Sequence, residues 1–129
     1  MFIKLDFESS EPIYQQLVFR IMEGIAMKEL KPGDDLPSVR SLASDIGINL
    51  HTVNKAYHQL KQEGFIQIHR QKGVVINPDG VPKADEQYKE RLKKNLHPLI
   101  TESICRDLGE EEFIKLCQTI YETYQGGRT

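Results

Sequence analysis

The chain has 129 residues, of which 39% are hydrophobic and 28% are charged. This composition is ordinary for a globular protein made of one domain, or of a small domain with an appendage. No apolar run reaches the ~18 residues needed to cross a bilayer, and residues 1–10 lack the basic start and long apolar core of a signal peptide. We therefore expect a cytoplasmic protein that does not enter a membrane.

The net charge of −2 argues mildly against a nucleic-acid partner, but the charges are distributed unevenly. Residues 28–77 carry seven basic and five acidic side chains, whereas residues 78–129 carry eight basic and ten acidic ones. The positive excess is small. Binding to DNA would therefore need dimerisation or specific contacts in addition to bulk electrostatics.

The first predicted helix starts after Ser10 and ends near Lys28 or Glu29. Its apolar side chains recur every four residues, at Ile13, Leu17, Ile21 and Ile25. Ser10 is the expected N-cap, with Pro12 in the first turn. Residues 31–37 contain two prolines and a glycine, which predict a turn-rich connection.

Residues 38–60 predict two short amphipathic helices. Each shows the i, i+3, i+4, i+7 spacing of one helix face: Val39, Leu42, Ala43 and Ile46, then Val53, Ala56, Tyr57 and Leu60. Between them, Gly47 indicates a helix stop, Ile48 a buried turn residue and Asn49 a new N-cap. Two helices joined in this way form a helix-turn-helix, whose second helix enters the DNA major groove in proteins that read DNA.

Residues 65–77 predict a β-hairpin, because segments 65–68 and 74–76 are rich in β-branched and aromatic residues around a polar, basic turn. The expected fold class is therefore α+β, mostly α. Residues 1–77 form a winged helix-turn-helix of three helices plus the hairpin, or wing. Residues 78–84 form a linker with two prolines and a glycine.

Residues 85–129 predict two C-terminal helices. Pro98 should kink or interrupt the first, Gly109 should end it, and the second should begin near Glu110. Two helices alone cannot form a substantial core, so their apolar stripes need the winged domain or a second copy of the chain. We expect a second copy, because two-fold symmetry places two recognition helices in successive major grooves. The expected dimerisation residues are Leu92, Leu96, Leu99, Ile100, Ile104, Phe113, Leu116 and Ile120.

Candidate base contacts lie near the start of the second helix of the motif. With Val53 turned inward, the polar residues around it face outward or to the flanks. The candidates are Asn49, which also caps the helix, His51, Thr52, Asn54 and Lys55. An Asn side chain suits adenine, and a Lys suits guanine or a phosphate. The alternative for all of them is a solvated outer face.

Candidate phosphate contacts flank this helix. Arg40 lies in the helix that crosses the DNA backbone in this geometry, and its alternative role is a surface ion pair. Ser38 is an N-cap first and a phosphate donor second. Arg70, Lys72 and Gly73 form the basic hairpin tip, whose alternative is simple solvation.

No catalytic arrangement emerges from the chain, so we expect no enzyme activity, cofactor or metal. The four histidines lack the i, i+4 spacing of a helical metal pair. A metal site combining His97 with Cys105 or Cys117 is the minor alternative. The two cysteines are otherwise expected as reduced thiols.

Several motifs resemble the GntR family of bacterial transcription regulators. They are Pro12–Leu17, Pro32-Gly33-Asp34, Leu36–Arg40 with Leu42-Ala43, Gly47-Ile48-Asn49, Thr52-Val53, Lys55-Ala56-Tyr57 with Leu60, and Glu63–Ile66. The resemblance covers residues ~10–77. It implies a sequence-specific DNA-binding regulator, nucleoid-associated when bound. Two positions differ from the family pattern: Leu50 stands where many members have a basic residue, and Gln71 stands where the wing usually has a glycine.

The two-helix tail resembles the YtrA-like branch of that family. The resemblance implies a homodimer joined through these helices that represses a transporter operon by binding a (pseudo)palindromic site on double-stranded DNA. A small-molecule effector stays open as a further partner. The alternative function is a winged-helix module that binds protein and not DNA.

Overall fold

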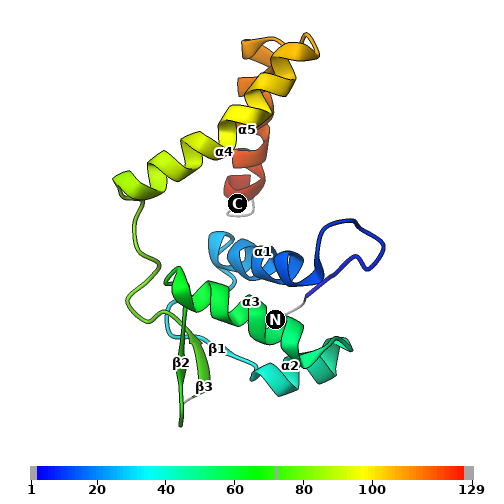
Figure 1. The fold of residues 1–129 in the computed structure, drawn as a ribbon. Coiled ribbons are helices and arrows are strands. Elements are labelled where there is room, and N and C mark those ends of the chain that lie inside the picture. The colour runs from blue at the N-terminus through cyan, green and yellow to red at the C-terminus, as the bar shows by residue number, and fades with distance from the viewer. Residues whose placement is uncertain (1–2, 72, 127–129) are drawn as a thin grey trace. The chain divides into compact units, whose positions relative to one another are not determined.

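The computed structural model describes residues 3–71 and 73–126, and it divides the chain into two compact units, Met1–Pro82 and Lys83–Thr129. The first unit contains three helices and a small sheet, and the second contains two helices (Figure 1). This is the expected fold class of a winged helix-turn-helix followed by two C-terminal helices.

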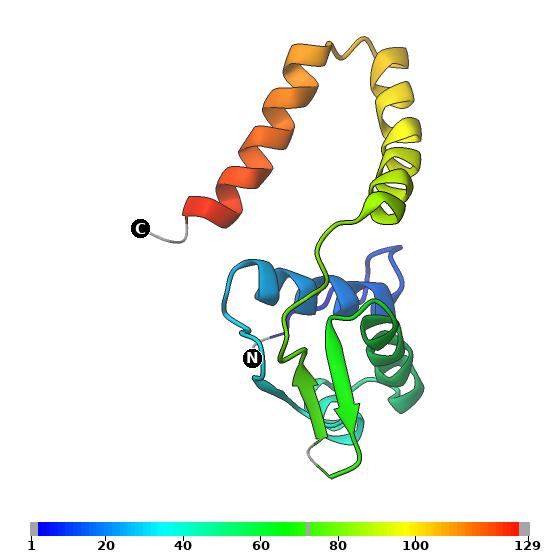
Figure 2. The same cartoon turned by 90° about the vertical axis from the view of Figure 1, so that its left-hand side faces the viewer.

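The first unit, here called the winged unit, contains six elements. They are α1 (Ile13–Ala26), β1 (Asp35–Leu36), α2 (Val39–Ile46), α3 (Leu50–Gln62), β2 (Ile66–His69) and β3 (Gly73–Ile76). The predicted helices and hairpin are all present. Strand β1 was not predicted, because its two residues lie in a segment that looked like a turn. It pairs with β3, so that the sheet is antiparallel in the order β1-β3-β2 (Figure 2).

The start of α1 differs from the prediction. Ser10 is not its N-cap: Pro12 occupies that position in a non-helical conformation, and its carbonyl accepts hydrogen bonds from the backbone N–H groups of Gln15 and Gln16. The buried Gln16 side chain in turn bonds to both the N–H and the carbonyl of Asp6, at 2.8 and 2.9 Å. This pair of bonds attaches the N-terminal segment to α1.

Helix α3 lies at the centre of the winged unit, because it packs against α1, α2 and β2. One hydrophobic core joins all three helices to the sheet. Its most deeply buried side chains are Leu17, Ile21, Val53, Tyr57, Leu60, Ile66 and Ile76. With its inner face committed to this core, α3 leaves a single polar face for solvent or a ligand.

The second unit consists of α4 (Glu86–Cys105) and α5 (Glu110–Gly126). Pro98 lies inside α4 and does not interrupt it, although Figure 1 shows α4 bending along its length. The helix ends at Cys105, before the expected stop at Gly109, and Asp107 in the turn that follows has a left-handed φ of 61°. The two helices diverge from their connecting turn (Figure 2).

Candidate nucleic-acid interface

The turn between α2 and α3 contains the predicted helix stop, buried turn residue and N-cap. Gly47 adopts the left-handed conformation, with φ of 70°, that ends a helix, and its N–H bonds to the Ala43 carbonyl. The Ile48 side chain is half-buried against the core. The Asn49 side chain then caps α3 by accepting the His51 N–H at 2.7 Å. These local bonds set the direction in which α3 leaves the corner.

A buried tyrosine attaches the middle of α3 to the start of α2. The Tyr57 hydroxyl donates to the carbonyl of Pro37 at 2.7 Å, next to the α2 N-cap. Because the ring is fully buried, burial raises the pKa of the Tyr57 hydroxyl far above its ordinary range. The hydroxyl therefore stays protonated and keeps donating. The sequence pattern placed Tyr57 in the core but gave no signal of this bond.

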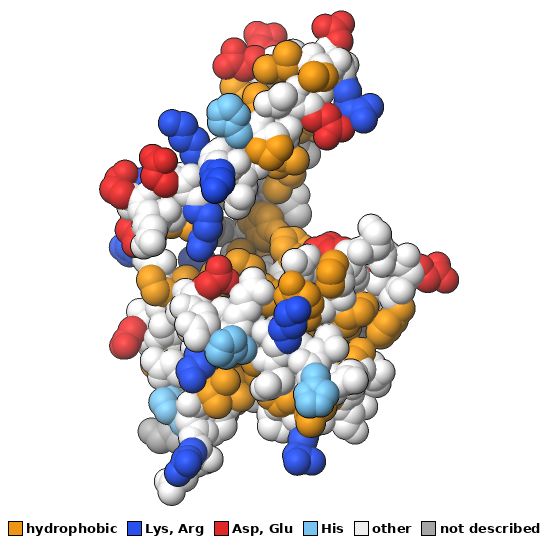
Figure 3. All heavy atoms as spheres, in the orientation of Figure 1, with side chains coloured by type: hydrophobic (Ala, Val, Ile, Leu, Met, Phe, Trp, Pro, Cys, Tyr) orange, Lys and Arg blue, Asp and Glu red, His pale blue; other side chains and the backbone are white. Residues whose placement is uncertain are grey.

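The outer face of α3 carries most of the predicted base contacts. His51, Asn54 and Lys55 are exposed, together with His58 one turn further along, whereas Thr52 is half-buried. In Figure 3, Lys, Arg and His side chains gather over α3 and the wing, and most acidic side chains of that face lie elsewhere. A helix with this polar, weakly basic face is suited to the base edges of a major groove.

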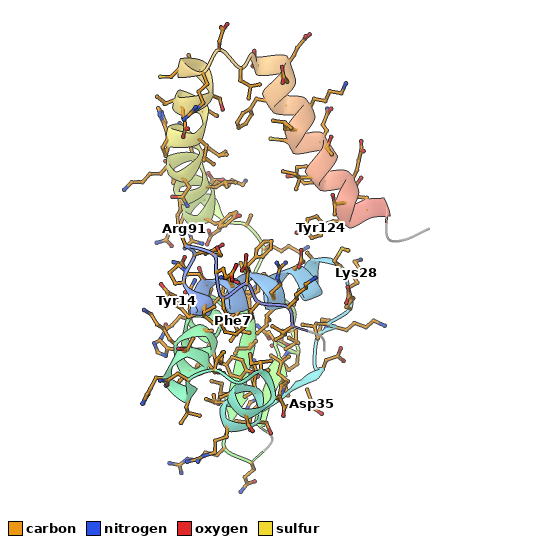
Figure 4. All side chains as sticks on the ribbon, turned by 90° about the vertical axis from the view of Figure 1, so that its right-hand side faces the viewer. Phe7, Tyr14, Lys28, Asp35, Arg91 and Tyr124 are labelled. Carbon is orange, nitrogen blue, oxygen red and sulfur yellow. The ribbon has the colours of Figure 1, made fainter. Side chains whose placement is uncertain are left out.

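Lys55 is less free than its exposure suggests. Its ammonium lies over the ring of Tyr14 on α1, with Nζ 4.0 Å from the ring centre. A cation–π contact of this kind holds the ammonium at the edge of the α3 face that adjoins α1. Figure 4 shows Tyr14 at the end of α1 beside α3. Tyr14 is thus a positioning partner that the sequence pattern did not single out.

The start of α2 supplies two of the predicted phosphate contacts. Ser38 is the N-cap, and its hydroxyl oxygen accepts the Ser41 N–H at 3.1 Å. The hydroxyl proton is not used by this bond and could be donated to a phosphate. Arg40 is exposed in the first turn of α2. No ion pair to Arg40 occurs among residues 3–71 and 73–126, so its alternative, a surface ion pair, is not formed there.

The wing places a third set of candidates beyond α3. Strands β2 and β3 pair from Ile66 and Ile76 to His69 and Gly73, where Gly73 has a φ of 81°. Arg70 is exposed in the turn. The predicted contact Lys72 lies outside the described residues.

The base of the wing is held by Asn77, the last residue of the predicted hairpin, to which the sequence pattern gave no role of its own. The Asn77 amide donates to the carbonyl of Gly64 at 2.9 Å and its oxygen accepts the Asp79 N–H at 3.0 Å. Its own backbone N–H bonds to the Phe65 carbonyl. An Asn-Pro-Asp-Gly run does signal an Asn side chain bonding two residues ahead. Nothing local signals the bond back to Gly64.

The predicted dimerisation residues stay uncovered within one chain. None of the described residues 83–125 is buried. Leu99, Ile104, Leu116 and Ile120 are 58%, 69%, 53% and 61% exposed, Leu92 and Ile100 are also exposed, and Leu96 and Phe113 are half-buried. Exposed aliphatic surface of this extent is typical of interaction sites in proteins.

Comparison with known proteins identifies the family. The model of bacterial regulatory proteins of the GntR family matches residues 10–76, which is half of the chain. The chain belongs to the GntR family. The HTH-type transcriptional repressor YtrA of Bacillus subtilis is 34% identical over 98% of this chain and 97% of its own length.

Two solved structures extend the likeness beyond the winged unit. A transcriptional antiterminator from Listeria monocytogenes matches with a TM-score of 0.87 at 28% identity, covering 96% of this chain and 92% of that one. YtrA from Sulfolobus acidocaldarius, a GntR-family transcription factor, matches with a TM-score of 0.63 at 41% identity, covering 77% and 97%.

As a GntR-family member, the chain is a DNA-binding transcriptional regulator, and regulators of this family are not enzymes. The comparisons give no support to the alternative of a protein-binding module. Within the described residues, no cluster of His, Cys, Asp and Glu could hold a metal ion, and none of the helices is long and apolar enough to span a bilayer.

Proposed function

We propose that this GntR-family regulator is a homodimeric repressor that binds a (pseudo)palindromic operator in the bacterial cytoplasm, on the nucleoid. Helix α3 enters the major groove with His51, Thr52 and Asn54 toward base edges. Ser38 and Arg40 at the start of α2, and Arg70, Lys72 and Gly73 in the wing, contact phosphates on either side. The single observation that carries this proposal is the polar face of α3, exposed while its opposite face is locked into the core.

Dimerisation is supported by the exposed apolar side chains of α4 and α5. In water these side chains are stabilised by burial against an equivalent surface, at about 25 cal/mol per Å² of apolar area removed from solvent. A dimer with a two-fold axis through the tails would offer two copies of α3 to the DNA. Their half-sites would then lie one helical turn of DNA apart, or a multiple of it.

Repression and control of a transporter operon are supported by resemblance rather than by the geometry. The Bacillus subtilis relative is named a repressor, and the two-helix tail is the feature that resembles its branch. A small-molecule effector stays open: the surface hollow on α4 that is lined by Glu90, Arg91, Lys93, Lys94 and His97 is open to solvent, whereas ligand sites usually enclose most of the ligand.

The test is selection of genomic fragments by the full-length protein, followed by mobility shift of the selected fragment at several salt concentrations. We expect Arg40→Ala and Lys55→Ala each to weaken the shift. Lys115→Ala on α5 is the charge-matched control and should leave binding intact. Recovery of no preferred fragment would contradict the proposal.

A further inference from the structure

Leu50, the first residue of α3, is an apolar side chain with no partner in the core. It is 38% exposed and stands outside the hydrophobic cluster that takes in Ile48 and Val53 on either side of it. Its position at the N-terminal turn is the part of a recognition helix that approaches base edges. An aliphatic side chain there cannot hydrogen-bond to any base.

The local structure does not need Leu50. The N-terminus of α3 is capped by Asn49. The apolar residue that precedes an N-cap and packs against the helix is Ile48, which is half-buried. A polar residue at position 50 would leave both of these interactions in place. Leu50 is therefore available for a contact outside the unit.

The geometry of α3 gives Leu50 a chemical neighbour. Asn54 lies four residues later, so both side chains project from the same side of the helix, and both are exposed. In the major groove an Asn pairs with N6 and N7 of adenine, and the only apolar group that any base presents is the C5-methyl of thymine. The two side chains together match an A·T-containing step.

We propose that Leu50 contacts the C5-methyl group of a thymine in each half-site and so determines specificity there, with Asn54 on an adjacent or paired adenine. A G·C pair at that position would place polar base edges against leucine without hydrogen-bond partners, which is unfavourable. This inference rests on the proposed function, since it needs a specific operator.

The experiment replaces thymines of the selected fragment one at a time by deoxyuridine, which lacks only the methyl group. Dissociation constants come from mobility shift with the full-length protein. Burial of one methyl group is worth about fourfold in affinity. We therefore expect about fourfold weaker binding at one thymine position in each half-site, and near-equal binding at the others.

The variants assign this effect to its residue. Leu50→Ser should bind thymine and deoxyuridine fragments equally, whereas Leu50→Met should keep the difference. Thr52→Ser, which removes the methyl group of a half-buried neighbour on the same turn of α3, should also keep it. Circular dichroism and thermal unfolding should be unchanged in Leu50→Ser, because the side chain is outside the core.

The inference fails if Leu50→Ser still discriminates between the two fragments, because another residue would then read the methyl. It also fails if the wild-type protein discriminates at no position of a selected fragment, in which case the proposed function stands alone. Failure to select any fragment would overturn both.

Discussion

The ammonium of Lys55 on α3 lies 4.0 Å from the centre of the Tyr14 ring on α1. The contact adds a cation–π interaction between α3, the proposed reading helix, and α1, which already share the hydrophobic core. It holds the Lys55 side chain toward α1 and away from the centre of the exposed face of α3. Lys55 is thereby pre-positioned at the margin of the interface, where the DNA backbone would run.

This placement predicts that Lys55 neutralises a phosphate. Replacing it by Gln should weaken binding about equally for all DNA sequences and lower the slope of log affinity against log salt by about 0.9. The slope is measured by fluorescence anisotropy across a salt series. Arg106→Gln, at the far end of α4 and paired with Glu102 at 2.7 Å, is the charge-matched control. A loss of affinity that depends on the base at a single position of the DNA would instead indicate that Lys55 contacts a guanine.

The exposed stripe of the tail predicts that single charges there separate the subunits. Ile104→Asp and Ile120→Asp place a carboxylate among side chains that the dimer would bury, which is costly without a partner. Sedimentation equilibrium should show monomers for both variants and for a fragment ending at Pro82. Gln118→Asp, an exposed polar position on α5, should remain dimeric. A stable dimer of the Pro82 fragment would place the interface elsewhere.

The buried Tyr57 hydroxyl predicts loss of stability in alkali. Its pKa is raised in the folded protein, whereas in the unfolded chain a tyrosine ionises near pH 10. Above about pH 10 the unfolded state therefore loses a proton that the folded state keeps, and the free energy of unfolding falls by up to about 1.4 kcal/mol per pH unit. Below that pH the contribution is fully present.

Urea unfolding at pH 8 to 11 measures this effect. Tyr57→Phe should unfold about 1 kcal/mol more easily at pH 8, because the Pro37 carbonyl loses its donor, yet show a weaker decline in alkali. Tyr121→Phe, whose ring is 69% exposed, should decline as the wild type does. If the stability of Tyr57→Phe fell in alkali as steeply as that of the wild type, the buried Tyr57 hydroxyl would not be the cause of the loss.

Gly64, which follows α3, is expected to tolerate substitution less well than any other glycine of the winged unit. Its φ is +84°, and a Cβ there would lie 2.8 Å from both Cγ and Cδ of Pro82. Gly33 has a similar φ of +88° with open space around it. Thermal unfolding should show Gly33→Ala destabilised by about 1–2 kcal/mol from backbone strain alone. Gly64→Ala should lose a further 1–3 kcal/mol or so from the clash; equal losses would show that Pro82 yields freely.

Local sequence patterns predict much of this architecture. The apolar spacing of residues 38–60 and the Gly47-Ile48-Asn49 corner specify the helix-turn-helix, because each helix stop and cap is a bond between residues that are close in the chain. The hairpin follows for the same reason. The family motifs then predicted the DNA-binding function, and this prediction did not require any knowledge of contacts between distant residues.

Pairings between distant residues could not be anticipated in this way. Strand β1 exists only because Leu36 meets Val74 of β3, and its two residues carry no strand signal of their own. The bonds from Tyr57 to Pro37 and from Asn77 to Gly64, and the contact of Lys55 with Tyr14, each span more than ten residues. Periodicity tells which face of a helix is apolar. Which partner meets that face, and which polar atom finds a bond there, depends on how the packed elements cross.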